Sequence, residues 1–186
     1  MKLSILVPTL ESRQAYLDMM LGSLEGQLTT DVEVLIERDN GEKTIGEKRN
    51  ILLERATGDY VVFVDDDDIV SWDYIASILG ATKTDPDVVG IHLLHYENYM
   101  LKGLTYHSLR FKEWFEEPHK EHQGLTNYYR NPNHINPVKR ELALQVKFPE
   151  TNMGEDKEYS KNLLPLLNTE HYVATPIYCY LFRSFK

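Results

Sequence analysis

Gly58-Asp59-Tyr60-Val61-Val62-Phe63-Val64-Asp65-Asp66-Asp67-Asp68 is the stretch of this sequence that decides the fold. Its middle part, residues 60–64, is a continuous run of β-branched and aromatic side chains that is entered through a Gly-Asp turn. Such a run is typical of a strand that is buried on both faces, as in a parallel sheet covered by helices. The stretch therefore predicts a central strand of an α/β sheet.

Four carboxylates, Asp65 to Asp68, follow the predicted strand. Like charges packed together raise one another's pKa, so the cluster is unfavourable unless solvent or a cation offsets it. The carboxyl ends of parallel strands are also where open α/β sheets bind ligands. Mg²⁺ and Mn²⁺ prefer oxygen ligands and are held by one or two carboxylates together with substrate phosphates. We therefore expect a divalent metal here; the alternative is a solvated acidic turn.

The composition is that of a single soluble globular domain over residues 1–186, with 42% hydrophobic and 26% charged residues. The net charge of −9 argues against nucleic acid as a partner, because such binding requires a basic surface. Cys179 is the single cysteine, which excludes an intrachain disulfide and a cysteine-rich zinc site. No apolar run reaches the ~20 residues of a transmembrane segment, and residues 1–10 are not typical of a signal peptide, so we expect a cytoplasmic location.

Strands and helices alternate over the first half of the chain. Ser12 and Ser71 are predicted to cap helices, and Trp72 is predicted to lie on a buried helix face. Another apolar stripe is predicted on the first helix at Tyr16, Met19, Met20 and Leu24. The expected strands are 2–7, 32–37, 60–64 and 88–94, with helices over 12–26, 46–56 and from residue 71. This order predicts a parallel sheet with right-handed crossovers.

The pattern changes after residue 97, where shorter and more polar strands are expected. These are 99–107, 109–115, 125–130, 171–173 and 177–182, with a charged loop over 118–124, a short helix through Val146 and a longer one over 154–167. No Gly/Ser-rich or Pro-rich linker accompanies the change. We therefore expect two halves of one domain, residues 1–97 and 98–186.

Three predicted strands end at Val7, Glu37 and Val64 and should lie side by side. The segments that follow them, residues 8–11, 38–41 and 65–68, would then present carboxylates, backbone N–H groups and a helix start to one ligand. The sequence has neither G-x-G-x-x-G after the first strand nor G-x-x-x-x-G-K-[ST], which excludes the usual dinucleotide and P-loop sites. Phosphate charge would have to be met by the metal, helped by Lys48 or Arg49.

Several short motifs occur together in a recognisable order: Pro8-Thr9, Asp39, Lys48-Arg49-Asn50, the Gly58-Asp59-Tyr60 strand entry, Asp65 to Asp68, and Gly154-Glu155-Asp156. In this order they resemble the family 2 glycosyltransferases, over roughly the first 80 residues and again over 136–167. The resemblance implies the GT-A fold, a Rossmann-like and mostly parallel central sheet flanked by helices. In that fold a nucleotide-sugar-binding half, here 1–97, is joined to a smaller mixed α+β half, here 98–186, which binds the acceptor and carries the catalytic Glu-Asp motif.

The resemblance also implies an activity. It is the metal-dependent transfer of a hexosyl group from a nucleotide-diphosphate sugar, in particular a UDP-sugar, to an acceptor hydroxyl with inversion. The acceptor would be a glycan, a lipid-linked sugar or a small molecule, and a homo-oligomer could complete the acceptor site. By the family's D-x-D motif, Asp67 would bind the Mn²⁺ or Mg²⁺ ion. The implied nucleotide-sugar contacts are Pro8, Thr9, Glu11, Asp39, Lys48, Asp65 and Asp66, with Asp65 also near the metal.

Asp156 is the candidate general base. Direct displacement requires a base within hydrogen-bond reach of the acceptor hydroxyl. The residues alone leave a simpler role open, because acidic side chains in a first helical turn complement the helix dipole. The resemblance favours the base.

The histidines and aromatic residues of the second half allow two interpretations each. His134 is a candidate third metal ligand, or a loop residue hydrogen-bonded to backbone. His92 and His95, three apart on a strand, point to opposite faces and cannot share an ion. Trp114, Tyr128 and Tyr129 either stack on a sugar ring or pack beneath the sheet, and packing is the commoner use of such side chains.

Two other functions compete with glycosyl transfer. A nucleotidyltransferase of related fold would release pyrophosphate instead of a nucleoside diphosphate. An inactive sugar-nucleotide or glycan-binding module would bind ligand and release neither product.

Overall fold

Three parallel strands form the nucleus of the computed structural model, which describes residues 2–184. Strand β1 (Leu3–Leu10) lies between β2 (Val32–Asp39) and β3 (Tyr60–Phe63). Val7 pairs with Ile36, and Leu6 pairs with Phe63, so the carboxyl ends of the three strands reach the same edge of the sheet. The predicted shared rim is thereby confirmed.

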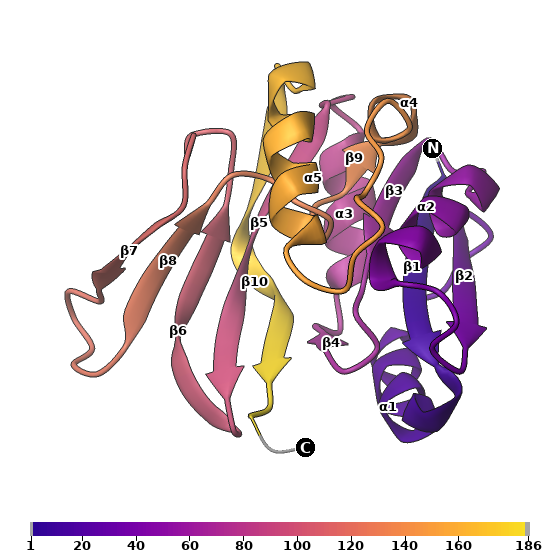
Figure 1. Cartoon of the computed structure of the whole chain (residues 1–186). Helices are drawn as coiled ribbons and strands as arrows, with labels where there is room; N and C mark the ends of the chain where they lie inside the picture. The colour runs from indigo at the N-terminus through magenta and orange to yellow at the C-terminus, as the bar shows by residue number, and fades with distance from the viewer. Residues whose placement is uncertain (1, 185–186) are drawn as a thin grey trace.

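The remaining strands extend this sheet and do not form a separate one (Figure 1). The order is β2-β1-β3-β9-β5-β6-β8-β7, and β10 pairs with both β5 and β4. The short β9 pairs antiparallel with both β3 and β5, which leaves β5 parallel to β3. The bounds are β4 (Ile69–Val70), β5 (Val88–Glu97), β6 (Met100–His107), β7 (Phe115–Pro118), β8 (Thr126–Arg130), β9 (Val138–Lys139) and β10 (Glu170–Phe182).

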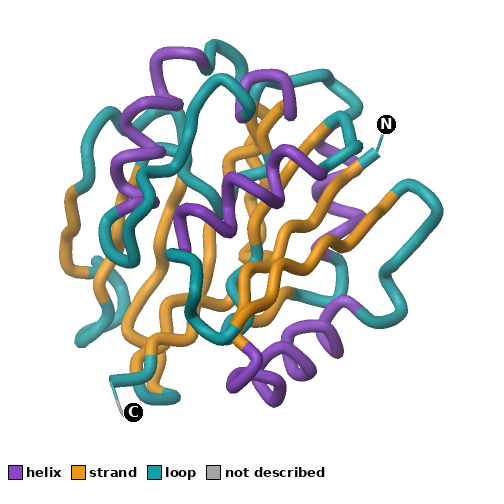
Figure 2. Tube along the Cα trace, turned by 45° about the vertical axis from the view of Figure 1, so that its right-hand side comes forward, coloured by secondary structure: helices purple, strands orange, loops and turns teal. Residues whose placement is uncertain are grey.

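Helices cover both faces of the sheet, which gives three layers (Figure 2). Side chains alternate between the faces along β1, so Ile5 packs toward α1 and α3 while Leu6 packs toward α2, α4 and α5. The helices are α1 (Gln14–Leu24), α2 (Ile45–Arg55), α3 (Tyr74–Thr82), α4 (Arg140–Ala143) and α5 (Glu155–Leu163), with 3₁₀ turns η1 (Glu11–Arg13) and η2 (Leu164–Leu166). The predicted α/β class with flanking helices is confirmed. None of the helices in the described chain combines the length and hydrophobicity needed to cross a bilayer.

Both predicted serine caps are wrong. Ser12 lies within η1, which delays the start of α1 until Gln14, and no side chain caps that helix. The buried face of α1 is formed by Leu17, Met20 and Leu24, so Met20 and Leu24 are buried as expected but Tyr16 and Met19 are exposed. Ser71 donates its hydroxyl to Asp73 before α3 begins.

The predicted burial of Trp72 is also wrong, since its side chain is 86% exposed. Trp72 precedes the first helical residue, Tyr74, so it does not share the face formed by Ile75 and Ile78. Leu79 is only partly buried against that core.

The second half departs from expectation at two strands. Residues 109–114 form no strand, because the Ser108 hydroxyl accepts the N–H of Arg110 and the Ser108 carbonyl accepts that of Phe111, which makes a turn. The last two predicted strands are one, β10, whose pairing shifts around Pro176. Proline has no N–H to give to the ladder, which explains the irregularity there.

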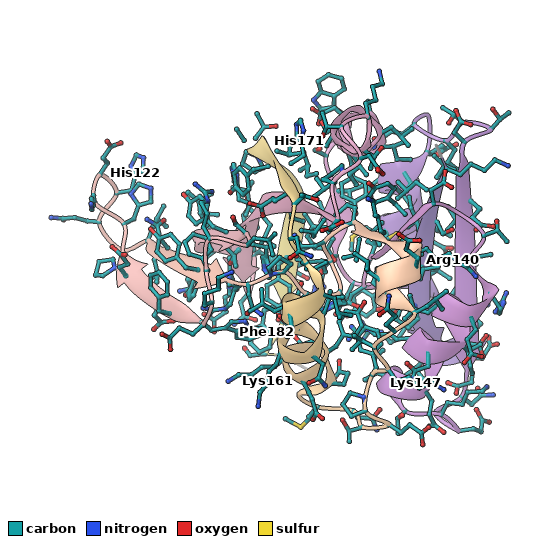
Figure 3. The ribbon with its side chains drawn as sticks, turned by 90° about the horizontal axis from the view of Figure 1, so that it is seen from above. His122, Arg140, Lys147, Lys161, His171 and Phe182 are labelled. Atoms are coloured by element: carbon teal, nitrogen blue, oxygen red, sulfur yellow. The ribbon has the colours of Figure 1, made fainter. Side chains whose placement is uncertain are left out.

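Two helices in the second half end earlier than expected. The short helix α4 ends at Ala143, before Val146, and α5 passes into η2 at Leu164, next to Pro165. The loop after β7 lies at the outer end of the sheet, where Figure 3 labels His122. This loop is therefore remote from the strand ends that form the site.

Candidate active site

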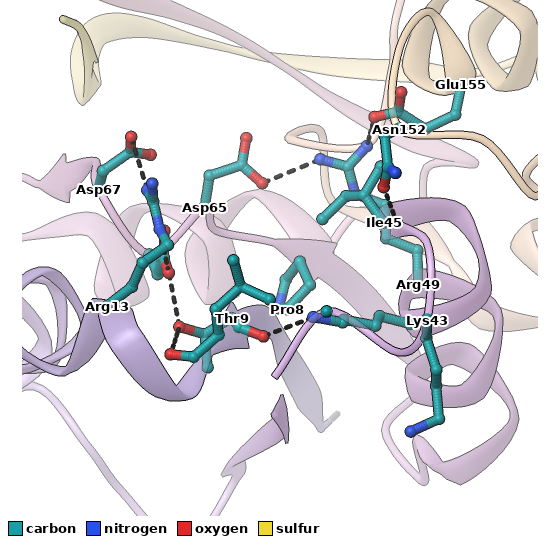
Figure 4. A pocket seen from close by; sticks show the side chains of 14 residues that line it. Pro8, Thr9, Arg13, Lys43, Ile45, Arg49, Asp65, Asp67, Asn152 and Glu155 are labelled. Atoms are coloured by element: carbon teal, nitrogen blue, oxygen red, sulfur yellow. Dashed lines mark hydrogen bonds and ion pairs between the residues drawn. The ribbon is translucent and has the colours of Figure 1, made fainter. Parts of the chain in front are cut away.

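A cavity of about 460 Å³ lies at the carboxyl ends of the parallel strands, against the start of α2 (Figure 4). Pro8 and Thr9 from the end of β1 line it, as do Asp65, Asp66 and Asp67. Lys48 also lines it, but Glu11 does not and instead pairs with Arg38. The cavity further includes five residues that the sequence interpretation did not place there: Arg13, Lys43, Ile45, Asn152 and Glu155. We refer to it as the rim cavity.

The start of α2 is fixed by its own sequence. Thr44 and Glu47 form a reciprocal capping box, which satisfies two backbone N–H groups. The next N–H groups are taken by the 151–152 loop, since Ile45 donates to Asn152 and Gly46 donates to Thr151. The predicted helix start is thus present at the rim, but these N–H groups already have partners. Any phosphate bound here would depend on side chains.

Asp66 and Asp67 are both held by Arg13. The guanidinium of Arg13 donates to both oxygens of Asp66 at 2.7–3.0 Å, and its Nη2 lies 2.8 Å from Asp67 Oδ2. Thr9 adds a hydroxyl donor to Asp66 at 2.5 Å, and Arg183 lies 4.0 Å from Asp67. Burial raises the pKa of Asp67, although Arg13 opposes that change. The protein's own arginines therefore offset part of the charge that the sequence assigned to a metal.

Asp68 is turned away from the rim cavity. It accepts hydrogen bonds from the hydroxyl of Tyr178 and the N–H of Leu181, each at 2.7 Å. Burial and the charge of Asp65 hold the pKa of Asp68 well above its usual value. Asp68 thus ties the acidic turn to β10.

The Asp65 side chain has two partners, Arg49 and His134. Its Oδ1 accepts from Arg49 at 2.9 Å, and its Oδ2 lies 3.4 Å from His134 Nε2. Burial raises the pKa of this carboxyl, but the charges of Arg49 and His134 outweigh burial and lower it. Asp65 is therefore a carboxylate at neutral pH, and its side chain remains 28% exposed.

Arg49 joins the two halves of the chain. It is 3% exposed and donates to Glu155 at 2.6 Å as well as to Asp65, with its guanidinium over the rings of Phe63 and Phe148. Glu155 is the first residue of α5 and precedes Asp156. The acidic turn and the start of α5 are thus held by one buried cation (Figure 4).

Asp39 and Lys48 form a second buried pair at the rim. Lys48 Nζ contacts the Asp39 carboxylate and donates to the Thr9 carbonyl at 2.7 Å. Burial raises the pKa of Asp39, but hydrogen bonds from Lys48 and from the N–H groups of Gly41 and Lys43 lower it to about 2. Asp39 therefore orders the turn after β2, and Lys48 links the ends of β1 and β2.

A smaller cavity of about 230 Å³ adjoins the first at Asp65, which lines both. His134 and Asp156 also line this smaller cavity, which we call the inner cavity. Gly154, two residues before Asp156, has a φ of 77°, which is in the left-handed region that glycine adopts readily. The Asp156 Oδ1 accepts the N–H of Lys157 at 2.8 Å, which fixes the direction of the carboxylate. The structure thus brings together Asp65, His134 and Asp156, which are distant in sequence.

The other aromatic candidates separate into two groups. Trp114, Tyr128 and His95 line the inner cavity, and the ring of Tyr128 stacks on that of His95. Tyr129 stacks on Tyr106 outside the cavity, which is a packing role. His92 does not line the inner cavity and packs against Tyr106 and Tyr172, in keeping with the prediction that it and His95 face opposite sides.

The carboxylates can be tested for their fit to a divalent ion. Among residues 2–184, no three His, Cys, Asp or Glu side chains form a ready metal site. Asp65 and Asp67 are nevertheless partly exposed and line the rim cavity, while Asp66 and Asp68 are buried in hydrogen bonds. Mg²⁺ is commonly held by one or two carboxylates together with substrate phosphates. Asp65 and Asp67 fit an ion that arrives with a phosphate ligand.

Arg13 is the main site residue that sequence reasoning missed. A signal was present, because Arg13 lies two residues beyond segment 8–11, which was expected to face the ligand. Glu155 was noted only as part of the Glu-Asp motif, since its partner Arg49 lies 106 residues away. Pairing over that distance cannot be inferred from residue spacing.

Comparisons with known proteins agree with this architecture. The family model described as Glycosyl transferase family 2 matches residues 34–144. Among solved structures, S. aureus TarS 1–349 in complex with UDP matches with a TM-score of 0.72 and 19% identity, covering 97% of this chain and 60% of that one. The complex of the same fragment with UDP-GlcNAc matches with a TM-score of 0.70 and 18% identity, covering 100% and 60%. Among curated proteins, none matches this sequence.

The chain thus spans about three fifths of the TarS fragments. At this level of identity, the likeness to TarS shows a shared fold.

Proposed function

The chain belongs to glycosyl transferase family 2, and on that premise we propose that it transfers a sugar from a nucleoside-diphosphate sugar to an acceptor hydroxyl. The observation that carries the proposal is the meeting of two cavities at Asp65. The rim cavity follows the ends of parallel strands, where α/β sheets bind nucleotides. The inner cavity contains Asp156, a carboxylate that could serve as base. A donor in the first and an acceptor in the second would meet beside Asp65.

The donor is proposed to be a UDP-hexose. The TarS structures that contain UDP and UDP-GlcNAc support a uridine nucleotide. Its nucleoside would lie near Pro8 and Thr9 at the end of β1, beside the turn after β2 that Asp39 orders. Its diphosphate would lie near Arg13 and Lys43, whose side chains are 33% and 38% exposed.

A divalent ion, Mg²⁺ or Mn²⁺, is proposed to bind with the donor through Asp65 and Asp67. His134 is a candidate third ligand, because its Nε2 lies 3.4 Å from Asp65 Oδ2. When bound, such an ion stabilises the negative charge that develops on a leaving diphosphate. In the structure as described, Arg13 already contacts Asp67 and can contribute positive charge to the same region.

Asp156 is proposed to act as the general base. It would accept the proton of the acceptor hydroxyl as that oxygen forms a bond to the anomeric carbon of the sugar. The bond from the anomeric carbon to the diphosphate oxygen breaks at the same time, and its electron pair leaves with the nucleoside diphosphate. Attack from the side opposite the leaving group inverts the anomeric configuration.

Product analysis tests this function. The protein is incubated with UDP-hexoses, Mn²⁺ and a panel of carbohydrate acceptors, and the products are followed by NMR. The proposal predicts free UDP and a glycoside whose anomeric configuration is opposite to that of the donor. Release of pyrophosphate from nucleoside triphosphates would instead support nucleotidyl transfer. Binding of donor without UDP release over the whole panel would support a binding module.

A further inference from the structure

A third cavity, of about 840 Å³, lies on the outer side of α5 and has no role in the reaction proposed above. Trp114 lines it and also lines the inner cavity, so the two spaces adjoin at one indole ring. Three lysines, Lys112, Lys157 and Lys161, line the same cavity. We call it the lysine cavity, and Figure 3 shows Lys161 extending from α5 toward the outside of the molecule.

Trp114 forms a fixed wall between the two spaces. Its indole N–H donates to Asn131 Oδ1 at 2.7 Å, and the amide of Asn131 donates in turn to the Ser160 carbonyl at 3.3 Å. The guanidinium of Arg130 lies 4.9 Å from the ring centroid. Because Trp114 is only half-buried and lines both cavities, part of its indole ring is available for contact with the C–H face of a sugar.

The lysines give this cavity a positive character in an acidic protein. All three are exposed, and none has an ion pair within residues 2–184. Glu113 and Glu158 also line the cavity, which leaves an excess of one positive charge there, while the whole chain carries −9. A local field of opposite sign to the net charge favours an anionic group at this position.

The start of α5 connects the two cavities in sequence. Asp156 lines the inner cavity and Lys157, the next residue, lines the lysine cavity. Lys157 Nζ lies 5.4 Å from the centroid of the Trp114 ring, and Lys161 follows one helical turn later. A ligand with one hydroxyl at Asp156 could therefore continue past Trp114 to the lysines.

We propose that the acceptor is an extended carbohydrate that carries an oxyanion, a phosphate or a carboxylate, and that the oxyanion lies in the lysine cavity. The inference rests on the proposed glycosyl transfer and names the class of its acceptor. One acceptor unit occupies the inner cavity with its hydroxyl toward Asp156. The next unit stacks against Trp114 and places its charge among Lys112, Lys157 and Lys161.

Direct binding tests this proposal independently of turnover. The chain has two tryptophans, so their indole N–H signals in a ¹H–¹⁵N spectrum report on two places: Trp114 between the cavities and Trp72, which is exposed elsewhere. Maltotriose, phosphorylated maltotriose and trigalacturonate serve as neutral, phosphate-bearing and carboxylate-bearing probes. We expect both anionic probes, or the one with the matching anion, to shift Trp114 but not Trp72, with at least about tenfold higher affinity than maltotriose.

A charge-matched pair of variants sharpens the test. In Lys112→Gln/Lys157→Gln/Lys161→Gln the preference for anionic probes should disappear. In Lys83→Gln/Lys102→Gln/Lys120→Gln, which removes the same charge elsewhere, it should remain. Equal affinity of all three probes, no Trp114 shift with any of them, or a preference that survives the first substitution would overturn the proposal. UDP-hexose binding is measured in parallel: if it is retained in those cases, only the acceptor inference fails, and if it is absent, the proposed transfer fails.

Discussion

The rim cavity and the inner cavity meet at Asp65 but differ in how fully their polar side chains are paired. In the rim cavity each aspartate has a strong partner, with Arg13 on Asp66 and Asp67 and Arg49 on Asp65. Around the inner cavity two buried imidazoles, His107 and His134, each leave Nδ1 without a hydrogen bond in the described structure. The rim is thus dominated by ion pairs, whereas the inner cavity combines aromatic rings with imidazoles that lack part of their hydrogen bonding.

This difference matches the two ligands proposed. A nucleoside diphosphate is anionic and benefits from cations whose positions are already fixed. A sugar ring carries no charge, and proteins bind it with aromatic side chains and a small number of polar side chains. Arg49 is the residue that joins the two regions, because it forms ion pairs with both Asp65 and Glu155.

Replacing Asp156 should affect the inner cavity alone. Asp156→Asn keeps the shape of the side chain but removes its ability to accept a proton, so transfer should fall by up to about 10⁴-fold. UDP-hexose binding, measured by thermal shift, should be unchanged because Asp156 does not line the rim cavity. Turnover within tenfold of wild type would remove Asp156 from the mechanism.

Removing Arg49 should disrupt both regions together. Arg49→Met fills similar space between Phe63 and Phe148 but leaves Asp65 and Glu155 without their shared cation. We expect a loss of about 3 kcal/mol in the free energy of unfolding, measured by urea titration. Arg49→Lys keeps the charge and should recover part of this loss. A change below about 1 kcal/mol in the methionine variant would show that the bridge does not hold the two halves together.

Lowering the pH should reduce the free energy of unfolding because of His107, which lines the inner cavity. Burial, with the charges of His134 and Arg130, lowers the pKa of His107 to about 3. Below the unfolded-state pKa of about 6.5, the unfolded chain binds a proton that the folded chain does not, so stability falls as pH falls. The contribution is about 2 kcal/mol between pH 6.5 and pH 5.

The measurement is urea unfolding at pH 7, 6 and 5 for the wild type and His107→Gln. The variant should lose less stability than the wild type over this range, while His122→Gln, in the exposed loop, should follow the wild type. Equal pH dependence in all three proteins would mean that His107 is not buried as a neutral imidazole.

The smallest effect is expected at the tip of the β5–β6 hairpin, outside both cavities. Asn98 and Tyr99 have φ values of 49° and 67°, and Tyr99 is 79% exposed. A non-glycine residue in this conformation is strained, so Tyr99→Gly should stabilise the protein by roughly 0.5–1 kcal/mol without changing donor binding. Loss of stability in thermal melting would show that the Tyr99 ring contributes more than its backbone strain removes.

The residues that line the rim cavity could be predicted from the sequence more completely than those that line the inner cavity. Residues 60–64 and the two strands before them are locally recognisable, and parallel pairing brings their ends to one edge. The inner cavity is assembled from segments around positions 65, 114, 134 and 156, whose contacts depend on how β5, β6 and β8 extend the sheet.

Local competition explains the errors outside the site. The hydroxyl and the carbonyl of Ser108 accept the N–H groups of Arg110 and Phe111, which makes a turn where the pattern suggested a strand. On α1 the buried face is formed by Leu17, Met20 and Leu24, which leaves Tyr16 and Met19 exposed. The acidic cluster is recognisable from its pattern and Arg13 from its position shortly after the first strand, but the pairing of Arg13 with Asp66 and Asp67 depends on the fold.

The central claim is that one donor and one acceptor meet beside Asp65, and a crystal structure with UDP-GlcNAc and Mn²⁺ tests it most directly. The account predicts uridine near Pro8 and Thr9, the diphosphate near Arg13 with an ion at Asp65 and Asp67, and the sugar directed toward Asp156 in the inner cavity. A nucleotide bound away from the rim cavity, or a sugar that points away from Asp156, would contradict it.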